Sequence, residues 1–328
     1  MIILFDKKKI IPILISAVLC SLMVAVSDIT GDTDIIFPEI CAVAIGVLAA
    51  PVRSWNTSKL RLMLTITAAA LLGMAVVRFV PFPRYIKMPI GLAAVTILIT
   101  LSQTNFLPAI SACILPIMYG THSAAYPLSV VTVTGITLLT QHILEKTGMR
   151  NKYRYVPIEP TRPLIRLRVA QVMIASIVCF IPLALERPFF IAPPLIVAFF
   201  EMTAPTSPVK KDMTTATVMM ALSAFLGVSC RILLGEIAGL PMAAAAAVTT
   251  CAIMFAIEIT GFYFPPCGSV GLLPYLIPQH TLVRFPFIVT TGFLIFAAIS
   301  LVSSNHVKHE MEEAEKENSE HTEAYNHI

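Results

Sequence analysis

The sequence predicts an all-α, polytopic membrane protein built from two repeats of the same orientation. Three observations support this prediction. Hydrophobic residues make up 57% of the 328-residue chain and charged residues only 13%, which is about half the charged share of a typical soluble domain. Apolar runs of about 20 residues recur along the chain, and this is the helix length that crosses the hydrocarbon core of a bilayer. Short motifs of the first half also recur in the same order in the second half.

Each half contains six apolar segments that are expected to be helical. They lie at 10–27, 35–51, 59–80, 88–104, 107–119 and 125–144, and then at 166–185, 190–204, 213–234, 241–260, 267–278 and 285–303. The expected parts of the chain are a membrane repeat at 1–145, a basic connector at 146–165, a second membrane repeat at 166–304 and a Glu-rich tail at 305–328. We interpret the first segment as an uncleaved helix, because it is longer than the apolar core of a usual signal peptide.

The positions of the basic residues predict the topology. Basic residues gather at the N-terminus, in the loop after the second segment of each half and in the middle of the chain: Lys7–Lys9, Arg53, Lys59, Arg61, Lys146, Arg150, Lys152, Arg154, Arg162, Arg166, Arg168, Lys210 and Lys211. By the positive-inside rule, the N-terminus, the connector and the C-terminal tail then face the cytoplasm of a bacterial-type cell membrane. Each half therefore crosses an even number of times, and the net charge of +4 reflects topology rather than nucleic-acid binding.

Prolines and glycines that recur in order indicate an internal duplication. Ala50-Pro51 corresponds to Ala204-Pro205, Leu72-Gly73 to Leu226-Gly227, Met88-Pro89 to Leu240-Pro241, Leu115-Pro116 to Leu273-Pro274, and Thr134-Gly135 to Thr291-Gly292. The offset drifts only from 152 residues (Met88 to Leu240) to 159 residues (Tyr126 to Phe285). In duplicated transporters, the solute site commonly lies where the halves meet.

Two segments of each half are too short for an ordinary crossing. Segment 267–278 would extend only ~18 Å as a helix, and its counterpart at 107–119 is only one residue longer. Segments 35–51 and 190–204 are also short and begin near prolines. Backbone that is not helical at membrane depth must be buried in protein or line a watery cavity, so matching breaks in two halves indicate a transport site. The alternative is that they are kinks filled by neighbouring helices.

The candidate solute-binding residues lie at these breaks and at the outer ends of two matching helices. The first group is Pro265, Pro266, Gly268 and Ser269 with Pro108 and Ser111, and the second is Arg231 with Arg78. Free N–H groups and the positive dipole end of a broken helix favour an anion. Arg78 and Arg231, with Arg84, Lys87 and Arg284, are expected to form a basic outer mouth that attracts anions. Glu39, Glu201 and Glu258, near the ends of spans, are either functional residues or interface anchors.

Three motifs resemble those of a known family. They are Ala204-Pro205-Thr206-Ser207-Pro208, Ala224-Phe225-Leu226-Gly227 and Phe264-Pro265-Pro266-Cys267-Gly268-Ser269-Val270-Gly271. They resemble the A-P-x-S-P stretch, the Gly-ending helix and the H-P-P-x-G-[AS] motif of the HPP family of integral membrane proteins. The resemblance covers 192–278 and, in a degenerate form, 37–118. It implies a carrier or channel for a small anion, because members of that family are implicated in nitrite transport. Phe264 replaces the name-giving histidine.

No enzyme motif is present, so the sequence predicts no catalytic residue, no metal ligand and no cofactor. The cysteines are scattered singly and are interpreted as small buried apolar residues: Cys20, Cys41, Cys113, Cys179, Cys230, Cys251 and Cys267. The expected function is a membrane transporter or channel for a small solute, specifically a small inorganic anion such as nitrite. Its expected partners are that solute and the lipid bilayer, with no nucleic acid, and a homo-oligomer is left open. The alternatives are a non-transporting sensor or assembly partner that uses the tail, and then a membrane-embedded lipid enzyme.

Overall fold

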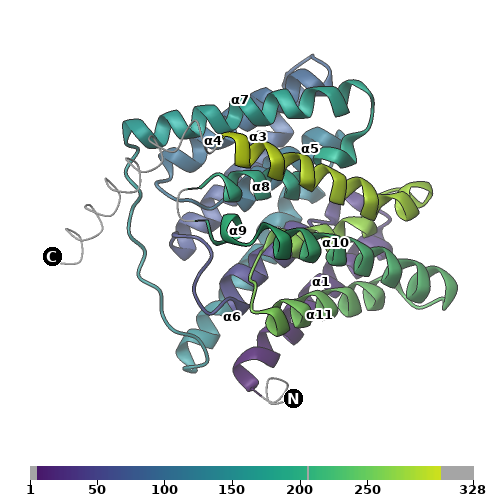
Figure 1. The fold of residues 1–328 in the computed structure, drawn as a ribbon. Helices are drawn as coiled ribbons and strands as arrows, with labels where there is room; N and C mark the ends of the chain where they lie inside the picture. The colour runs from purple at the N-terminus through teal and green to yellow at the C-terminus, as the bar shows by residue number, and fades with distance from the viewer. Residues whose placement is uncertain (1–5, 205–206, 304–328) are drawn as a thin grey trace. The chain divides into compact units, whose positions relative to one another are not determined.

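The computed structural model describes residues 6–204 and 207–303, and within these ranges the protein consists of helices and connecting loops without a strand. The chain divides into two compact units (Figure 1). Unit 1 comprises Met1–Ser54, Ser123–Tyr153 and Thr214–Thr290, and unit 2 comprises Trp55–His122, Arg154–Met213 and Thr291–Ile328. Each unit therefore combines segments from both halves of the sequence.

Eight of the helices in the described ranges are long and apolar enough to cross a membrane. They are α1 (Lys7–Thr30), α3 (Lys59–Phe79), α4 (Arg84–Leu101), α6 (Ala125–Lys146), α7 (Arg162–Ala184), α10 (Met213–Cys230) with its continuation η5 (Arg231–Ile237), α11 (Met242–Thr260), and the last helix, Gln279–Ser303, which begins as η7 (Gln279–Arg284). These helices confirm a multi-pass membrane protein of the all-α class.

Four shorter helical segments coincide with the short segments expected from the sequence. They are α2 (Glu39–Ala44) with η3 (Ile45–Ala49), α5 (Pro108–Tyr119), α8 (Pro193–Met202) after η4 (Pro188–Ile191), and α12 (Pro266–Leu272) with η6 (Leu273–Tyr275). Each begins at or directly after a proline. Proline suits the first helical turn, because its missing N–H would have no partner there. The remaining short elements are η2 (Thr33–Ile35) and α9 (Pro208–Lys211).

In unit 1, helices α1 and α2 of the first half pack with α11 and α12 of the second half, and α6 packs against α1 and α2. Helix α10 contacts α12 through Gly227. Helix α1 runs beside α11, as Figure 1 shows near the N-terminus. The short helix α12 lies against α2 and α11. A Cβ atom on Gly268 would come within 2.8 Å of Cys41 Sγ, so the approach of α12 to α2 depends on the missing side chain.

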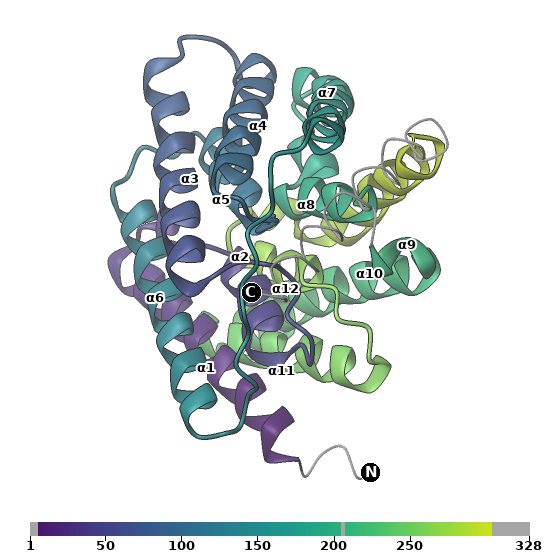
Figure 2. The same cartoon turned by 90° about the vertical axis from the view of Figure 1, so that its left-hand side faces the viewer.

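In unit 2, helices α3, α4 and α5 of the first half pack with α7 and α8 of the second half. Figure 2 shows α3, α4 and α5 side by side. Helix α4 also packs against α7, and the short helix α5 contacts the short helix α8. Each unit thus holds one contact between two short helices, and the two partners come from opposite halves of the sequence.

Several backbone features occur at corresponding positions of the two halves. Gly73 of α3 packs on the backbone of α5, and Gly227 of α10 packs on the backbone of α12. The left-handed residues also correspond: Gly31 (φ +71°) with Glu186 (φ +54°), and Gln103 (φ +53°) with Gly261 (φ +66°). Glutamate and glutamine rarely adopt this conformation. The residue type therefore does not explain why Glu186 and Gln103 share the left-handed conformation of the glycines at the corresponding positions of the other half.

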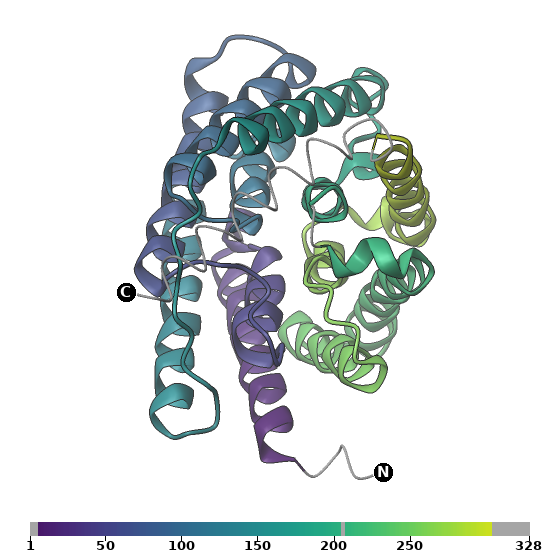
Figure 3. The same cartoon turned by 60° about the vertical axis from the view of Figure 1, so that its left-hand side comes forward.

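The connector between α6 and α7, at 147–161, contains no helix (Figure 3). The first part of the connector belongs to unit 1 and the part from Arg154 onward belongs to unit 2. The Glu-rich tail expected at 305–328 lies outside the described residues, as do Pro205 and Thr206 of the A-P-x-S-P stretch.

Candidate functional site

Four of the predicted solute-binding residues lie together at the beginning of α12 in unit 1. Pro265 is the N-cap and Pro266 the first residue of this helix, and Gly268 and Ser269 belong to its first turns. All four are buried. Gly268 lies against Cys41 and Ile45, so the break contacts the α2–η3 segment of the other half of the chain.

The other two residues of this group, Pro108 and Ser111, lie on α5 in unit 2. Both are fully buried or nearly so, and Ser111 has 0% of its surface exposed. The Ser111 hydroxyl has no hydrogen-bond partner among the described residues. A buried hydroxyl without a partner is costly, which makes this atom a candidate contact for a solute. The prediction that the α5 and α12 breaks meet is not tested, since they belong to different units.

Arginine side chains bind backbone carbonyls at the C-terminal ends of α12–η6 and α5. Arg231 donates to the carbonyl oxygen of Pro274 and, at 2.8 Å, to that of Ile277, and its Nε lies 3.5 Å from Glu236. Arg84 Nη1 donates to the carbonyl oxygen of Met118 at 3.2 Å, at the end of α5. The last carbonyls of a helix lack intrahelical partners and form its negative dipole end, so these contacts stabilise the helix ends.

The other residues of the expected basic mouth differ in their surroundings. Lys87 Nζ donates to the carbonyl oxygen of Val77 at 3.0 Å. Arg78 and Arg284 are exposed at the ends of their helices. The structure therefore gives Arg231, Arg84 and Lys87 a role in holding backbone carbonyls.

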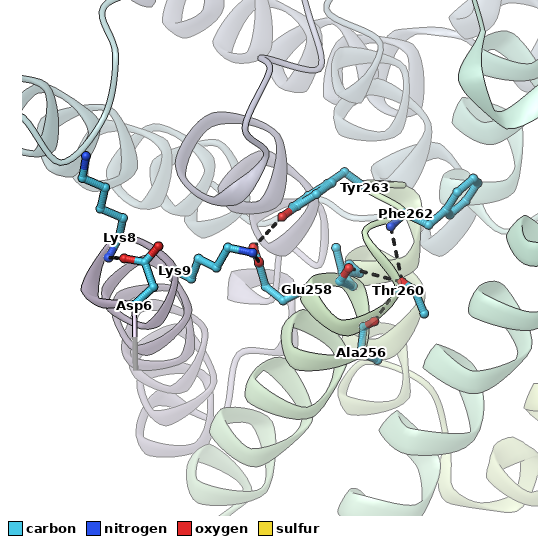
Figure 4. A network of polar contacts seen from close by, with 9 residues as sticks. Asp6, Lys8, Lys9, Ala256, Glu258, Thr260, Phe262 and Tyr263 are labelled. Atoms are coloured by element: carbon cyan, nitrogen blue, oxygen red, sulfur yellow. Dashed lines mark hydrogen bonds and ion pairs between the residues drawn. The ribbon is translucent and has the colours of Figure 1, made fainter. Parts of the chain in front are cut away.

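The corner between α11 and α12 is held by a buried carboxylate (Figure 4). Glu258, with 5% of its surface exposed, has Oε2 at 3.0 Å from Lys9 Nζ and accepts at Oε1 a hydrogen bond of 2.7 Å from the Tyr263 hydroxyl. Burial and the hydrogen bond to Glu258 raise the pKa of Tyr263 above its ordinary value. The sequence points to Glu258 as a functional residue or interface anchor but contains no signal for its contacts with Lys9 and Tyr263.

Of the other two acidic residues near span ends, Glu39 is buried and Glu201 is half-buried. Glu39 has only 1% of its surface exposed and lies in the first turn of α2, where the helix dipole favours a negative charge. Glu201, near the end of α8, accepts a hydrogen bond of 3.3 Å from Trp55 Nε1. Trp55 in turn packs edge-on against Phe106, next to the α5 break.

Two arginines lie near the end of η3 in unit 1: Arg150 of the connector and Arg53 of the loop that follows η3. Arg150 Nη1 donates to the carbonyl oxygen of Leu48 at 2.7 Å. Arg53 donates to Gln141 at 3.2 Å and lies over the ring of Tyr153, 5.2 Å from its centre. Burial, together with the neighbouring Arg53 charge, lowers the pKa of Arg150 to about 10. Both guanidinium groups are still charged at neutral pH.

No disulfide joins the seven cysteines, all of which lie in the described ranges, and five of them are buried. Among residues 6–204 and 207–303, no group of three or more His, Cys, Asp or Glu side chains is placed to hold a metal ion.

Comparison with known proteins adds nothing to these observations: no family model, no curated protein and no solved structure matches the chain. The HPP resemblance of 192–278 therefore stays a prediction from the motifs.

Proposed function

We propose that the protein is a membrane transporter or channel for a small inorganic anion, with nitrite as the first anion to test. The observation that carries this proposal is the contact between two short, proline-initiated helices within each unit: α2 with α12, and α5 with α8. Broken helices in matching positions of two halves are the usual origin of transporter binding sites. The HPP-like motifs around Pro265-Pro266 agree with this class of function.

The proposal includes two repeats of the same orientation, α1 to α6 and α7 to the last helix. The corresponding contacts of Gly73 and Gly227 support it, because each glycine meets the same kind of partner, a short helix of its own repeat. The corresponding left-handed residues support it as well. The interleaved contacts follow a simple rule, in which helix one of each repeat packs with helix four of the other repeat and helix two packs with helix five.

The short helices support a conduit because they are too short to cross a bilayer. Helix α5 has 12 residues and α8 has 10, so they extend only about 18 and 15 Å, against roughly 30 Å for the hydrocarbon core. Their ends must be covered by protein or water. Their N-termini favour an anion, and the Ser111 hydroxyl offers a neutral donor. In this proposal, Pro108 and Ser111 contact the solute at the α5 break of unit 2, and Pro265, Pro266, Gly268 and Ser269 contact it at the α12 break of unit 1. Arg78 and Arg231 attract the solute.

The proposed location is the cytoplasmic membrane, with both termini in the cytoplasm. The basic residues of the N-terminus and connector support this orientation. The ion pair between Lys9 and Glu258 agrees with it, since it places the beginning of α1 beside the end of α11 on one side of unit 1.

The test is anion uptake by liposomes that contain the purified full-length protein. We expect uptake of one or a few of nitrite, nitrate, formate and chloride, above protein-free liposomes. Truncation from Asn305 should leave the uptake unchanged, which separates a transporter from an assembly partner that acts through its tail. A folded protein that carries none of these anions contradicts the proposal and favours the non-transporting alternative.

A further inference from the structure

The corner between α4 and α5 contains a residue in an unfavourable conformation. Gln103 follows the end of α4 and has φ +53°. Thr104 N donates to the carbonyl oxygen of Ile99, a bond typical of helices that end in a left-handed residue. That residue is usually glycine, because a side chain is strained there. A glutamine persists in this conformation only where its surroundings hold it.

Three groups hold Gln103. Its carbonyl oxygen accepts hydrogen bonds from the Tyr155 hydroxyl at 2.8 Å and from the Ile158 N–H at 2.9 Å. Arg61 Nη1 donates to Gln103 Oε1 at 3.2 Å and to the carbonyl oxygen of Ser102 at 2.7 Å. The same guanidinium lies 5.0 Å from the centre of the Tyr155 ring. Two of the three groups, Tyr155 and Ile158, come from the connector.

Asn56 joins the same connector segment to the other side of the corner. Its side-chain amide donates to the carbonyl oxygen of Val156 at 2.6 Å and accepts from the Val156 N–H at 3.2 Å. This paired geometry resembles the pairing of two backbone strands. The backbone N–H of Asn56 donates to Asn105 Oδ1 at 2.6 Å. We call Tyr155–Ile158 the strap, since it is fastened both to Gln103 and, through Asn56, to Asn105.

The corresponding corner of unit 1 needs no strap. Gly261 occupies the position of Gln103, with φ +66° and no atom within 4 Å of a Cβ. Glycine adopts this conformation without strain. That corner is held instead by Tyr263 and Lys9 on Glu258. The strap contacts are therefore found at the α4–α5 corner, where Gln103 is strained, and the α11–α12 corner has an unstrained glycine instead.

We propose that the strap positions the first turn of α5 through Gln103 and Asn105, and thereby sets the affinity of the solute site at Pro108 and Ser111. Gln103 lies five residues before Pro108. When the strap is released, Gln103 relaxes toward an ordinary backbone conformation and the chain between them changes direction. The first turn of α5 then moves with it. The part of the proposal that concerns affinity rests on the proposed transport function.

The direct test is hydrogen exchange of the backbone amides at 104–110, apart from Pro108, which has no N–H, in the purified full-length protein. Tyr155→Phe removes the hydroxyl that donates to Gln103 and keeps the ring beside Arg61. We expect a rise in exchange of about tenfold at these amides, because their local opening becomes easier. The matched control is Tyr153→Phe, on the same connector but beside Arg53, and it should leave 104–110 unchanged. In a Gln103→Gly background, the added Tyr155→Phe change should have a smaller effect, since glycine removes the strain.

The second readout is the concentration dependence of uptake in liposomes. Tyr155→Phe should raise the KM for the anion several-fold, while the melting temperature stays close to that of the unchanged protein. Asn56→Asp removes the N–H group that donates to the carbonyl oxygen of Val156. It should change the KM and the melting temperature in the same way. Unchanged exchange at 104–110 in both variants overturns the strap. Raised exchange with unchanged KM overturns its role at the site. Should the unchanged protein carry no anion, the proposed function fails, while the exchange result still decides whether the strap holds the corner.

Discussion

A Cβ atom on Gly73 would lie 2.2 Å from the carbonyl oxygen of Cys113, so α3 and α5 touch through their backbones. Gly227 has the same relationship to the carbonyl oxygen of Gly271, which is also 2.2 Å from a Cβ at that position. A backbone carbonyl inside a helix cannot move aside as a flexible side chain can. Both long helices therefore depend on a glycine where they meet a short helix.

The first prediction is that Gly73→Ala and Gly227→Ala each destabilise the protein. Alanine favours a helix over glycine by about 1 kcal/mol, but the clash should outweigh this gain and lower stability by about 1–3 kcal/mol. Thermal unfolding in detergent measures the change. Gly235→Ala is the matched control, because the atoms nearest to its new Cβ belong to the flexible Met242 side chain. A Gly73→Ala protein as stable as the control variant contradicts the backbone contact.

The second prediction concerns the buried carboxylate in Figure 4. Lys9→Met should destabilise the protein more than Glu258→Gln. The Glu258 side chain is 3% exposed and that of Lys9 is 39% exposed, so removing the lysine leaves a buried charge without its partner, whereas removing the glutamate leaves a lysine that reaches water. Allowing for the exposure of Lys9, we expect a loss of about 1–2 kcal/mol for Lys9→Met.

The matched control for this prediction is Lys8→Met, since the Lys8 side chain is exposed. It should change the unfolding temperature very little. The prediction fails if Glu258→Gln is the more destabilising of the two main variants, because the carboxylate would then be stable without the lysine.

The sequence predicts the helices of this protein well, because length, hydropathy and proline positions are local properties. All the expected segments are helical, including the short ones that begin at Pro108, Pro193 and Pro266. The alignment of Gly73 with Gly227 also marks two positions that prove equivalent in their contacts. What the sequence does not predict is the interleaving of segments in each unit, since apolar helices carry no signal for their partners.

The contacts of the candidate site are less predictable than its position. The sequence predicts that Arg231 attracts a solute. In the structure its N–H groups donate to the backbone carbonyls of Pro274 and Ile277, and no motif predicts these contacts. The left-handed conformation of Gln103 has no signal in the residue itself. Only its alignment with Gly261, which carries the usual residue for that conformation, points to it.

The third prediction separates the two arginines of the candidate site. Arg231→Gln should destabilise the protein by about 1–3 kcal/mol, because buried carbonyls lose a charged donor. Arg78→Gln, at an exposed position, should change stability by less than about 0.5 kcal/mol. If Arg78 attracts anions, its loss should lower uptake at low ionic strength and have little effect near 1 M salt, where screening acts within ~3 Å. An uptake defect that is equal at both salt concentrations would mean that the charge of Arg78 does not act at a distance.

The fourth prediction is that Ser111→Ala raises stability and lowers anion uptake. The Ser111 hydroxyl is buried and has no partner among the described residues, so its removal should stabilise the empty protein by up to about 1 kcal/mol. If the hydroxyl donates to the anion, the same change should reduce uptake several-fold. Ser300→Ala is the matched control, since Ser300 is equally buried in unit 2 and its hydroxyl also lacks a partner there. A similar gain in stability for both variants, with uptake lost only in Ser111→Ala, would place the solute at the α5 break. Equal uptake in the two variants would remove Ser111 from the site.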